Sequence, residues 1–295
     1  MNVLVTGADG FIGRGVTAAL VNHTVWRSTI GEPTSDLGCQ IDLSDRGSVA
    51  KALERSRPDA IINCAGIVTN DDKAKLNVSF TDNLLEAVIK SRLPLKRIIV
   101  IGSASEYGIV NHLPVSEEAP LRPNTTYGRS KMEETSLALK LGREYGLPVI
   151  VARLFNLIGP GMHPRMLIPN IVTQIEQMRK RERDSLEVAR LDAKRDYVHV
   201  ADVATAFRVI LEHEPSDTVY NIGSRRATSN AELVDLILDE CKLLDKPKVI
   251  ETAKDPGPTY ASQADISRIT SQLGWKPSHS LAESIREIVH AEINR

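Results

Sequence analysis

Short apolar runs and longer amphipathic runs alternate along the first half of this chain. The short runs are rich in β-branched residues and predict buried strands at residues 2–6, 24–28, 39–43, 60–64 and 97–101. The longer runs have apolar residues at helical spacing and predict helices at residues 14–21, 48–56, 77–90 and 127–145. Strands and helices that alternate in this way build a parallel sheet with helices on both faces. We therefore expect an α/β fold with a doubly wound parallel sheet.

Three glycines follow the first strand at intervals of three residues, namely Gly7, Gly10 and Gly13. One glycine of such a turn takes a positive φ, a second lets the backbone approach a ligand, and a third lets the helix pack closely on the strand. The free N–H groups at the N-terminus of the following helix suit phosphate oxygens. The stretch predicts a dinucleotide-binding (Rossmann) unit. The alternative from this stretch alone is a glycine-rich turn in another kind of α/β protein.

The residues at the end of the second predicted strand indicate which dinucleotide is bound. A Rossmann unit commonly places a carboxylate there on the adenosine ribose, but this chain has Arg27 and Ser28, and Arg14 follows the glycines. An arginine attracts the 2′-phosphate that a carboxylate would repel, so we expect NADP(H) in preference to NAD(H). The alternative is that Arg14 and Arg27 are solvated surface charges.

Two further segments are expected to face the cofactor. Asp42 and Leu43 stand at the end of the third predicted strand, where they are placed to cover the adenine. Ala65 follows the fourth predicted strand, which fits a second turn against the cofactor.

Candidate chemistry lies at the end of the fifth predicted strand and in the helix that follows. Ser103 comes directly after that strand, and ligands of open α/β sheets bind beyond the carboxyl ends of the strands. Tyr127 and Lys131 are four residues apart at the start of a helix, so they share one helix face. A nearby ammonium favours the phenolate, so we expect the pKa of Tyr127 to be lowered and its hydroxyl to exchange a proton with a substrate.

The composition sets limits on the class of protein. Lys and Arg total 37 against 38 Asp and Glu, so the net charge of -1 gives no indication of nucleic acid as a partner. The three cysteines lack the spacing of a metal site or a disulfide framework, which favours a reducing compartment. No apolar run approaches the roughly 20 residues of a membrane span, and the first residues resemble a core strand rather than a signal peptide. We therefore expect a cytoplasmic protein that does not bind membranes.

These residues together resemble the extended branch of the short-chain dehydrogenase/reductase family, which acts on nucleotide sugars. The resemblance covers essentially the whole chain and rests first on Thr6-Gly7-Ala8-Asp9-Gly10-Phe11-Ile12-Gly13, Asp42-Leu43, Ser103, Tyr127 and Lys131. It implies that Ser103 orients the substrate oxygen and that Tyr127 is the acid/base. It also implies that Lys131 tunes Tyr127 and holds the nicotinamide ribose, and that Phe11 and Ile12 lie with the glycines against the cofactor.

Two later segments resemble the substrate contacts of the same family. In residues 153–161 the resemblance implies that Asn156 touches the sugar nucleotide, and in residues 194–202 that Arg195 meets the diphosphate. An arginine fork suits phosphate oxygens, so the chemistry agrees. His199 in the second segment has no ligand partner at metal spacing and is predicted to be structural, so no metal site is predicted.

One departure from the family concerns the diphosphate. Asp255 stands near the place where the family often has a second diphosphate-binding arginine. We expect Lys254 or Arg225 to substitute for it, or the nucleotide to be held differently.

The reaction is indicated by the segment that begins at Ser103. Dehydratases of the family carry an acid at the first or second place after this residue, and those places hold Ala104 and Ser105. Glu106 stands one residue further on, and a slip of one residue on extended backbone turns a side chain to the opposite face. Dehydration is therefore not expected. Residues 101–108 and 155–161 most resemble those of GDP-6-deoxy-4-keto-D-mannose reductases.

The resulting prediction is hydride transfer from NADPH to C4 of a GDP- or dTDP-linked 4-keto-6-deoxyhexose, with Tyr127 as the proton donor. An NAD-dependent nucleotide-sugar 4-epimerase would use the same three residues and remains the alternative. A non-catalytic cofactor sensor would be expected to lack Tyr127 or Lys131, and this chain retains both.

The predicted organisation has two lobes. Residues 1–153 are expected to bind the cofactor and residues 154–295 to form a smaller substrate-binding lobe, with segments crossing between the two. In relatives the helices around residues 81–90 and 131–145 form a four-helix dimer interface, so the resemblance implies a homodimer.

Overall fold

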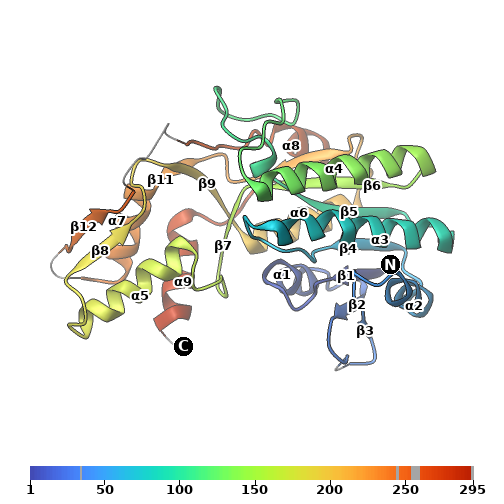
Figure 1. Ribbon diagram of the computed structural model, residues 1–295, viewed down its shortest axis with the longest axis horizontal. Helices are drawn as coiled ribbons and strands as arrows, with labels where there is room; N and C mark the ends of the chain where they lie inside the picture. Colours follow the sequence, from blue (N-terminus) through green and yellow to red (C-terminus); the bar gives the residue numbers. More distant parts are fainter. Residues whose placement is uncertain (34, 244–245, 254–259, 294–295) are drawn as a thin grey trace.

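The computed structural model describes residues 1–33, 35–243, 246–253 and 260–293, and a parallel sheet dominates its larger lobe (Figure 1). Its strands are β1 (Asn2–Thr6), β2 (Thr24–Thr29), β3 (Gly38–Gln40), β4 (Ala60–Asn63), β5 (Arg97–Ser103), β6 (Val149–Leu154) and β10 (Val219–Ile222). They lie in the order β10-β6-β5-β4-β1-β2-β3, and every neighbouring pair is parallel. The doubly wound parallel sheet expected from the sequence is therefore confirmed.

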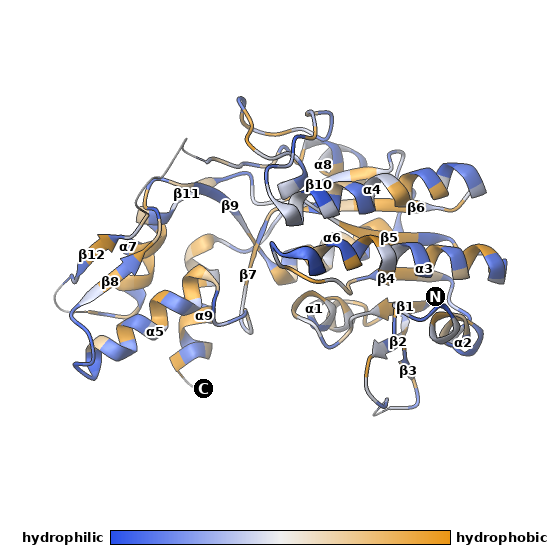
Figure 2. Ribbon diagram, in the orientation of Figure 1, coloured by the Kyte–Doolittle hydropathy of each residue, from blue (hydrophilic) through white to orange (hydrophobic). Residues whose placement is uncertain are grey.

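Helices cover both faces of this sheet. One face carries α1 (Phe11–Ala19), α6 (Val200–Glu212) and α8 (Ser267–Leu273), and the other carries α2 (Arg46–Ser56), α3 (Leu76–Ser91) and α4 (Thr126–Tyr145). Side chains alternate along each strand, so Val3 and Val5 join the core under α1 and α6, while Leu4 joins the core under α2 and α3. Because both faces are buried, the central strands are mostly apolar, as the orange colour along β5 in Figure 2 shows, whereas the edgeward β2 contains Thr24, Arg27 and Ser28.

The third strand is shorter than the sequence predicted, ending at Gln40 rather than at Leu43. The side chain of Asp42 accepts hydrogen bonds from the backbone N and the hydroxyl of Ser44, at 2.8 and 2.6 Å. This turn bends the chain away from the sheet before the predicted strand is complete.

A smaller lobe is built from segments that follow β6, at the left of Figure 1. Its strands β7 (Asn156–Ile158), β9 (Lys194–His199) and β11 (Ala227–Ser229) form one sheet, and β8 (Ser185–Val188) pairs with β12 (Lys248–Glu251). Helices α5 (Leu167–Arg179), α7 (Asn230–Glu240) and α9 (Leu281–Ile293) pack on a separate apolar core that includes Ile171, Leu186 and Ile288. Within the described residues, no helix is both long and apolar enough to cross a membrane.

The chain crosses between the lobes more than once. It leaves the large sheet after β6, builds β7 to β9 in the small lobe, and then returns with α6 and β10. The division near Arg153 therefore stays a prediction about which lobe binds which ligand.

The position of β1 determines where a ligand can bind. β2 and β4 flank β1, and the chain order along the sheet reverses between β1 and β4. Open α/β sheets bind ligands outside the carboxyl ends of the strands at such a switch point. The turns after β1, β4 and β5 all lie at that edge.

Candidate active site

The turn between β1 and α1 is pressed against the end of β4. Gly7 has a φ of +60°, and a Cβ added there would lie 2.8 Å from both Cα and N of Ala65. A Cβ at Gly13 would lie 2.1 Å from the carbonyl oxygen of Gly7. Only glycine fits at either position, because the backbone itself occupies the space of a side chain.

The N-terminus of α1 is open to an anion. Gly10 is its N-cap, no side chain caps the helix there, and its first turn contains no acidic residue. Phe11 packs against the core of the small lobe, and Ile12 packs against the core of the large sheet. The turn therefore offers N–H groups to a diphosphate while its apolar residues hold the helix between the two lobes.

The two arginines that favoured NADP(H) have different neighbours. Nη2 of Arg27 lies 3.2 Å from Oδ1 of Asp9, an exposed ion pair with a residue of the glycine turn itself. Nη2 of Arg14 would lie 3.6 Å from a Cβ at Gly161, so Arg14 reaches the turn that follows β7. Arg27, in the second half of β2, is therefore the arginine that pairs with the glycine turn.

The remaining cofactor candidates lie at the ends of neighbouring strands. The carboxylate of Asp42 is exposed, and its hydrogen bonds from Ser44 lower its pKa. Leu43 is buried, and its carbonyl accepts a hydrogen bond of 2.8 Å from Asn83. The backbone N of Ala65 donates to the hydroxyl of Thr6 at 3.3 Å, which ties the end of β4 to the end of β1.

The structure brings Ser103, Tyr127 and Lys131 together. Ser103 is the last residue of β5, its hydroxyl accepts a 3.1 Å hydrogen bond from the backbone N of Ser105, and its side chain is close enough to the phenol of Tyr127 to influence the pKa of that phenol. Tyr127 lies in the first turn of α4, which Thr125 caps by accepting a 2.9 Å hydrogen bond from Gly128. Lys131 is buried one turn further along the same helix face.

The expected lowering of the Tyr127 pKa is wrong. Burial raises the pKa of Tyr127 above its ordinary value, and it outweighs the opposing effect of the Lys131 ammonium. The carboxylate of Glu134 acts in the same direction as burial, because a negative charge disfavours the phenolate. The spacing of Tyr127 and Lys131 predicts that an ammonium lies near the phenol. It does not predict the burial of the phenol or the nearby carboxylate of Glu134, and both of these raise its pKa.

Glu106 is fully buried and occupied by structural contacts. Its Oε1 accepts hydrogen bonds from the backbone N of Ser103 at 2.7 Å and from the hydroxyl of Thr135 at 3.0 Å. Its Oε2 accepts one from Nε of Arg153 at 2.9 Å. Burial raises its pKa, and Arg153 offsets part of that rise. Glu106 therefore holds the short 3-10 helix η2 (Ala104–Glu106), and with it Ser103, in place.

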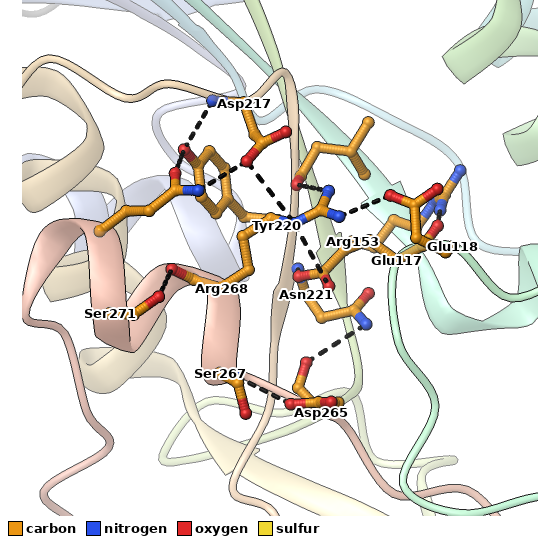
Figure 3. A network of polar contacts seen from close by, with 12 residues as sticks. Glu117, Glu118, Arg153, Asp217, Tyr220, Asn221, Asp265, Ser267, Arg268 and Ser271 are labelled. Atoms are coloured by element: carbon orange, nitrogen blue, oxygen red, sulfur yellow. Dashed lines mark hydrogen bonds and ion pairs between the residues drawn. The ribbon is translucent and has the colours of Figure 1, made fainter.

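A network of polar groups extends from this turn to β10 and α8. Nη1 of Arg153 donates to the hydroxyl of Tyr107 at 3.1 Å, and that hydroxyl donates to Oδ1 of Asn221 at 2.7 Å. The backbone N of Asn221 donates to Oε1 of Glu117 at 2.8 Å, and Oε2 of Glu117 lies 3.8 Å from Nε of Arg268 (Figure 3). The contacts between these residues could not be predicted from the sequence, because the residues come from strands and loops far apart along the chain.

The two substrate candidates lie on the sheet of the small lobe. Asn156 is exposed at the start of β7 and is in register with Tyr197 of β9. The guanidinium of Arg195 lies 3.9 Å from the ring centre of Tyr260 and donates to the carbonyl oxygens of Lys194 and Tyr260 at 3.1 and 3.3 Å. Burial lowers the pKa of Arg195. Both of these acceptors are neutral carbonyl oxygens, so they leave the positive charge of the guanidinium available to a phosphate.

Of the two residues expected to replace the second diphosphate-binding arginine, the structure describes only Arg225. Lys254 and Asp255 lie outside the described residues. Arg225 has a φ of +67°, and its backbone N donates to Oδ2 of Asp196 at 3.0 Å. The buried Asp196 also accepts from the N atoms of Ser224 and Ala264, so it fixes this loop.

His199 has the structural role that the sequence predicted. Its Nδ1 accepts a 3.2 Å hydrogen bond from the backbone N of Ala201 and so caps α6. Its ring stacks on His279, with 4.3 Å between the ring centres. In the described part of the chain, no group of three or more His, Cys, Asp or Glu side chains is arranged to hold a metal ion.

Comparison with known proteins decides the family. The model of the NAD dependent epimerase/dehydratase family matches residues 3–223 of the chain. The chain belongs to this family. It is an NAD(P)-dependent enzyme of the extended short-chain dehydrogenase/reductase type.

Members of the family that resemble this chain differ in their reactions. GDP-6-deoxy-D-mannose reductase of Pseudomonas aeruginosa is 31% identical, with 97% of this chain and 95% of the relative covered. dTDP-6-deoxy-L-talose 4-dehydrogenase (NAD(P)(+)) of Kitasatospora kifunensis is 28% identical, with 98% and 95% covered. Among solved structures, RMD from Pseudomonas aeruginosa complexed with NADPH has a TM-score of 0.86 and 28% identity, with 100% of both chains covered. UDP-glucose 4-epimerase from Thermotoga maritima with UDP-glucose has a TM-score of 0.85 and 25% identity, with 100% and 99% covered.

Proposed function

We propose that the protein is a reductase that uses NADPH to reduce C4 of a GDP- or dTDP-linked 4-keto-6-deoxyhexose. The observation that carries this proposal is that no free carboxylate follows Ser103 at the positions where a dehydratase has its acid. Ala104 and Ser105 hold the places of a dehydratase acid, and the nearby Glu106 is turned away into contacts with Arg153 and Thr135. The similarity to the GDP-6-deoxy-D-mannose reductase supports the same reaction.

The chain's residues fit a phosphorylated dinucleotide. The glycine turn leaves no room for side chains at Gly7 and Gly13, and the N-terminus of α1 has no side-chain cap. Arg27 stands where a carboxylate would select NAD(H), so we propose NADP(H) as the preferred cofactor. When bound, this cofactor supplies the hydride.

Tyr127 acts as the proton donor in this mechanism. Its raised pKa keeps the phenol protonated at neutral pH, which suits a group that must donate a proton to the developing C4 alkoxide. Ser103 lies beside the phenol at the end of β5, so its hydroxyl would bind the same oxygen and stabilise its charge. The ammonium of Lys131 stabilises the phenolate that remains after the proton has left.

Arg195 and Asn156 are the proposed substrate contacts. Arg195 is held flat by the Tyr260 ring, so its outward N–H groups are oriented for the diphosphate. Asn156 is exposed on the neighbouring strand of the same sheet, which places it for a hydrogen bond to the sugar.

The test is a time course of the purified protein with NADPH and a panel of GDP- and dTDP-4-keto-6-deoxyhexoses. Nicotinamide absorbance and sugar products are followed together. We expect one NADPH to be consumed for each 4-hydroxy sugar formed. Tyr127→Phe is expected to lower kcat by about 10²–10⁴-fold while the Kd for NADPH stays unchanged.

The alternative is a nucleotide-sugar 4-epimerase, which would use the same three residues. The similarity to the UDP-glucose 4-epimerase of Thermotoga maritima favours this second candidate. No net NADPH loss, together with cofactor retained through purification and interconversion of UDP-hexoses, would establish it and contradict the reductase.

We also propose that the protein is a homodimer in which α3 and α4 of two copies pack together. The two helices lie side by side on one face of the sheet, as Figure 1 shows. Light scattering at micromolar concentration is expected to give twice the chain mass of 32.4 kDa, and a monomer mass would contradict the proposal.

A further inference from the structure

A second buried ion pair lies next to Tyr127. Nζ of Lys131 lies 2.5 Å from Oε2 of Glu134, and the two side chains are 6% and 3% exposed. The two residues are three apart on α4, so the pairing is part of the helix face that also carries Tyr127. A carboxylate this close to Lys131 partly neutralises the ammonium and so weakens its effect on the ionisation of Tyr127.

Glu134 is also the end of a chain of buried hydrogen bonds that starts at the glycine turn. The hydroxyl of Thr6 donates to Oδ1 of Asn63 at 2.5 Å, and Nδ2 of Asn63 donates to the hydroxyl of Thr81 at 3.2 Å. The hydroxyl of Thr81 donates to Oε1 of Glu134 at 2.7 Å. All donors point the same way, and Lys131 donates to the same carboxylate from the other side.

This series of hydrogen bonds connects three elements around the candidate site. Thr6 directly precedes Gly7 at the end of β1, Asn63 ends β4, and Thr81 belongs to α3. All three side chains are at most 1% exposed. They form a buried polar network in which the hydrogen bonds are satisfied, and such a network is rigid. The position of the Lys131 ammonium is thereby tied to the backbone of the glycine-rich turn.

We propose that Glu134 is a positioning residue that fixes the Lys131 ammonium between the phenol of Tyr127 and the cofactor-binding turn. This inference rests on the roles proposed above for Tyr127 and Lys131. It adds that Glu134 limits how strongly Lys131 favours the phenolate.

The charged groups around the phenol agree with this role. Tyr127 is influenced by Lys131, which favours the phenolate, and by Glu134 and Glu106, which oppose it. Burial alone would lower the pKa of Lys131, but Glu134 and Tyr127 raise it above its ordinary value. Removing the charge of Glu134 leaves the ammonium uncompensated, so the phenol becomes more acidic.

The first measurement is the ionisation of Tyr127 in Glu134→Gln, taken as the difference in phenolate absorbance between each protein and its Tyr127→Phe counterpart. We expect the pKa of Tyr127 to fall by about one unit, since nearby charges shift a pKa by this order. The second measurement is NADPH binding followed by fluorescence. We expect the Kd to rise about tenfold, because a mobile ammonium loses a charge-assisted hydrogen bond to the cofactor.

Glu133→Gln is the matched control, because Glu133 is the exposed neighbour on the same helix and the change of charge is the same. It is expected to leave both measurements unchanged. Glu134→Asp keeps the charge but shortens the side chain, so the Tyr127 pKa should stay near the wild-type value while NADPH binding weakens. If Glu134→Gln does not fold, unchanged NADPH binding in Glu134→Asp overturns the proposal.

An unchanged Tyr127 pKa and an unchanged Kd in a folded Glu134→Gln protein would also overturn it. Both measurements omit the sugar substrate. They therefore decide the role of Glu134 even if the reductase proposal fails in the turnover assay.

Discussion

The buried pair of Arg153 and Glu106 leads to a quantitative prediction about stability. Nε of Arg153 lies 2.9 Å from Oε2 of Glu106, and the two side chains are 5% and 0% exposed. Arg153→Met keeps an unbranched apolar side chain but leaves the Glu106 carboxylate buried without its counter-charge. Removing one partner of a buried ion pair costs about 3–5 kcal/mol. We expect the variant to lose that amount of unfolding free energy at neutral pH.

The loss should depend on pH in one direction. Burial already holds the pKa of Glu106 above its ordinary value, and without Arg153 it rises further. The folded variant then binds a proton at a pH where the unfolded carboxyl is still ionised, so its stability relative to the wild type improves as the pH falls. The difference in unfolding free energy is therefore smaller at about pH 5 than at about pH 8.

The assay is urea unfolding followed by tryptophan fluorescence at several pH values. Arg46→Met is the control, because the Arg46–Asp82 pair has the same 2.9 Å separation but side chains that are 54% and 34% exposed. Exposed pairs contribute about 0–1 kcal/mol, so this variant should lose no more than that at any pH. Equal losses in the two variants, or a loss in Arg153→Met that does not change with pH, would refute the reasoning.

Three further predictions concern ligand binding. Gly7→Ala is expected to abolish NADPH binding in a fluorescence titration, because its Cβ would lie 2.8 Å from backbone atoms of Ala65 at a positive φ; wild-type affinity would show that the turn is wrongly assigned. Arg27→Glu is expected to raise the Kd for NADPH at least about tenfold with little change for NADH, and an equal effect on both cofactors would argue against 2′-phosphate recognition. Arg195→Met is expected to raise KM for the nucleotide sugar about tenfold with a smaller change in kcat, whereas a fall in kcat at constant KM would place Arg195 elsewhere than at the diphosphate.

Local patterns were sufficient to predict the first five strands of the large sheet, but β6 was not among them. The apolar runs and the glycine spacing depend on neighbouring residues only, so strand, turn and helix could be placed from the sequence at β1 and α1. The helical spacing of Tyr127 and Lys131 likewise follows from one element. The return of β10 to the sheet could not be predicted, because pairing between β6 and β10 depends on the whole intervening lobe.

The electrostatics of the site could be predicted only in part. Glu134 stands three residues after Lys131, and that spacing was a signal for an ion pair, but burial of the pair follows from packing against α3. Arg153 meets Glu106 because β5 and β6 pair in a register that sets Gly102 beside Arg153. Such contacts between strands are fixed by the assembled sheet and leave no periodicity in the sequence.

The late return of β10 has a consequence for how the chain can be divided. β6 pairs with β5 on one side and with β10 on the other, and β10 is made of residues 219–222. A fragment that stops soon after residue 154 would present the fully buried β6, with its unpaired N–H and C=O groups, as an open sheet edge. During synthesis the same edge is exposed until the small-lobe segments have left the ribosome. The larger lobe is therefore a unit in space but not in the order of the chain, and its sheet is completed only after β7, α5, β8 and β9 of the smaller lobe have been made.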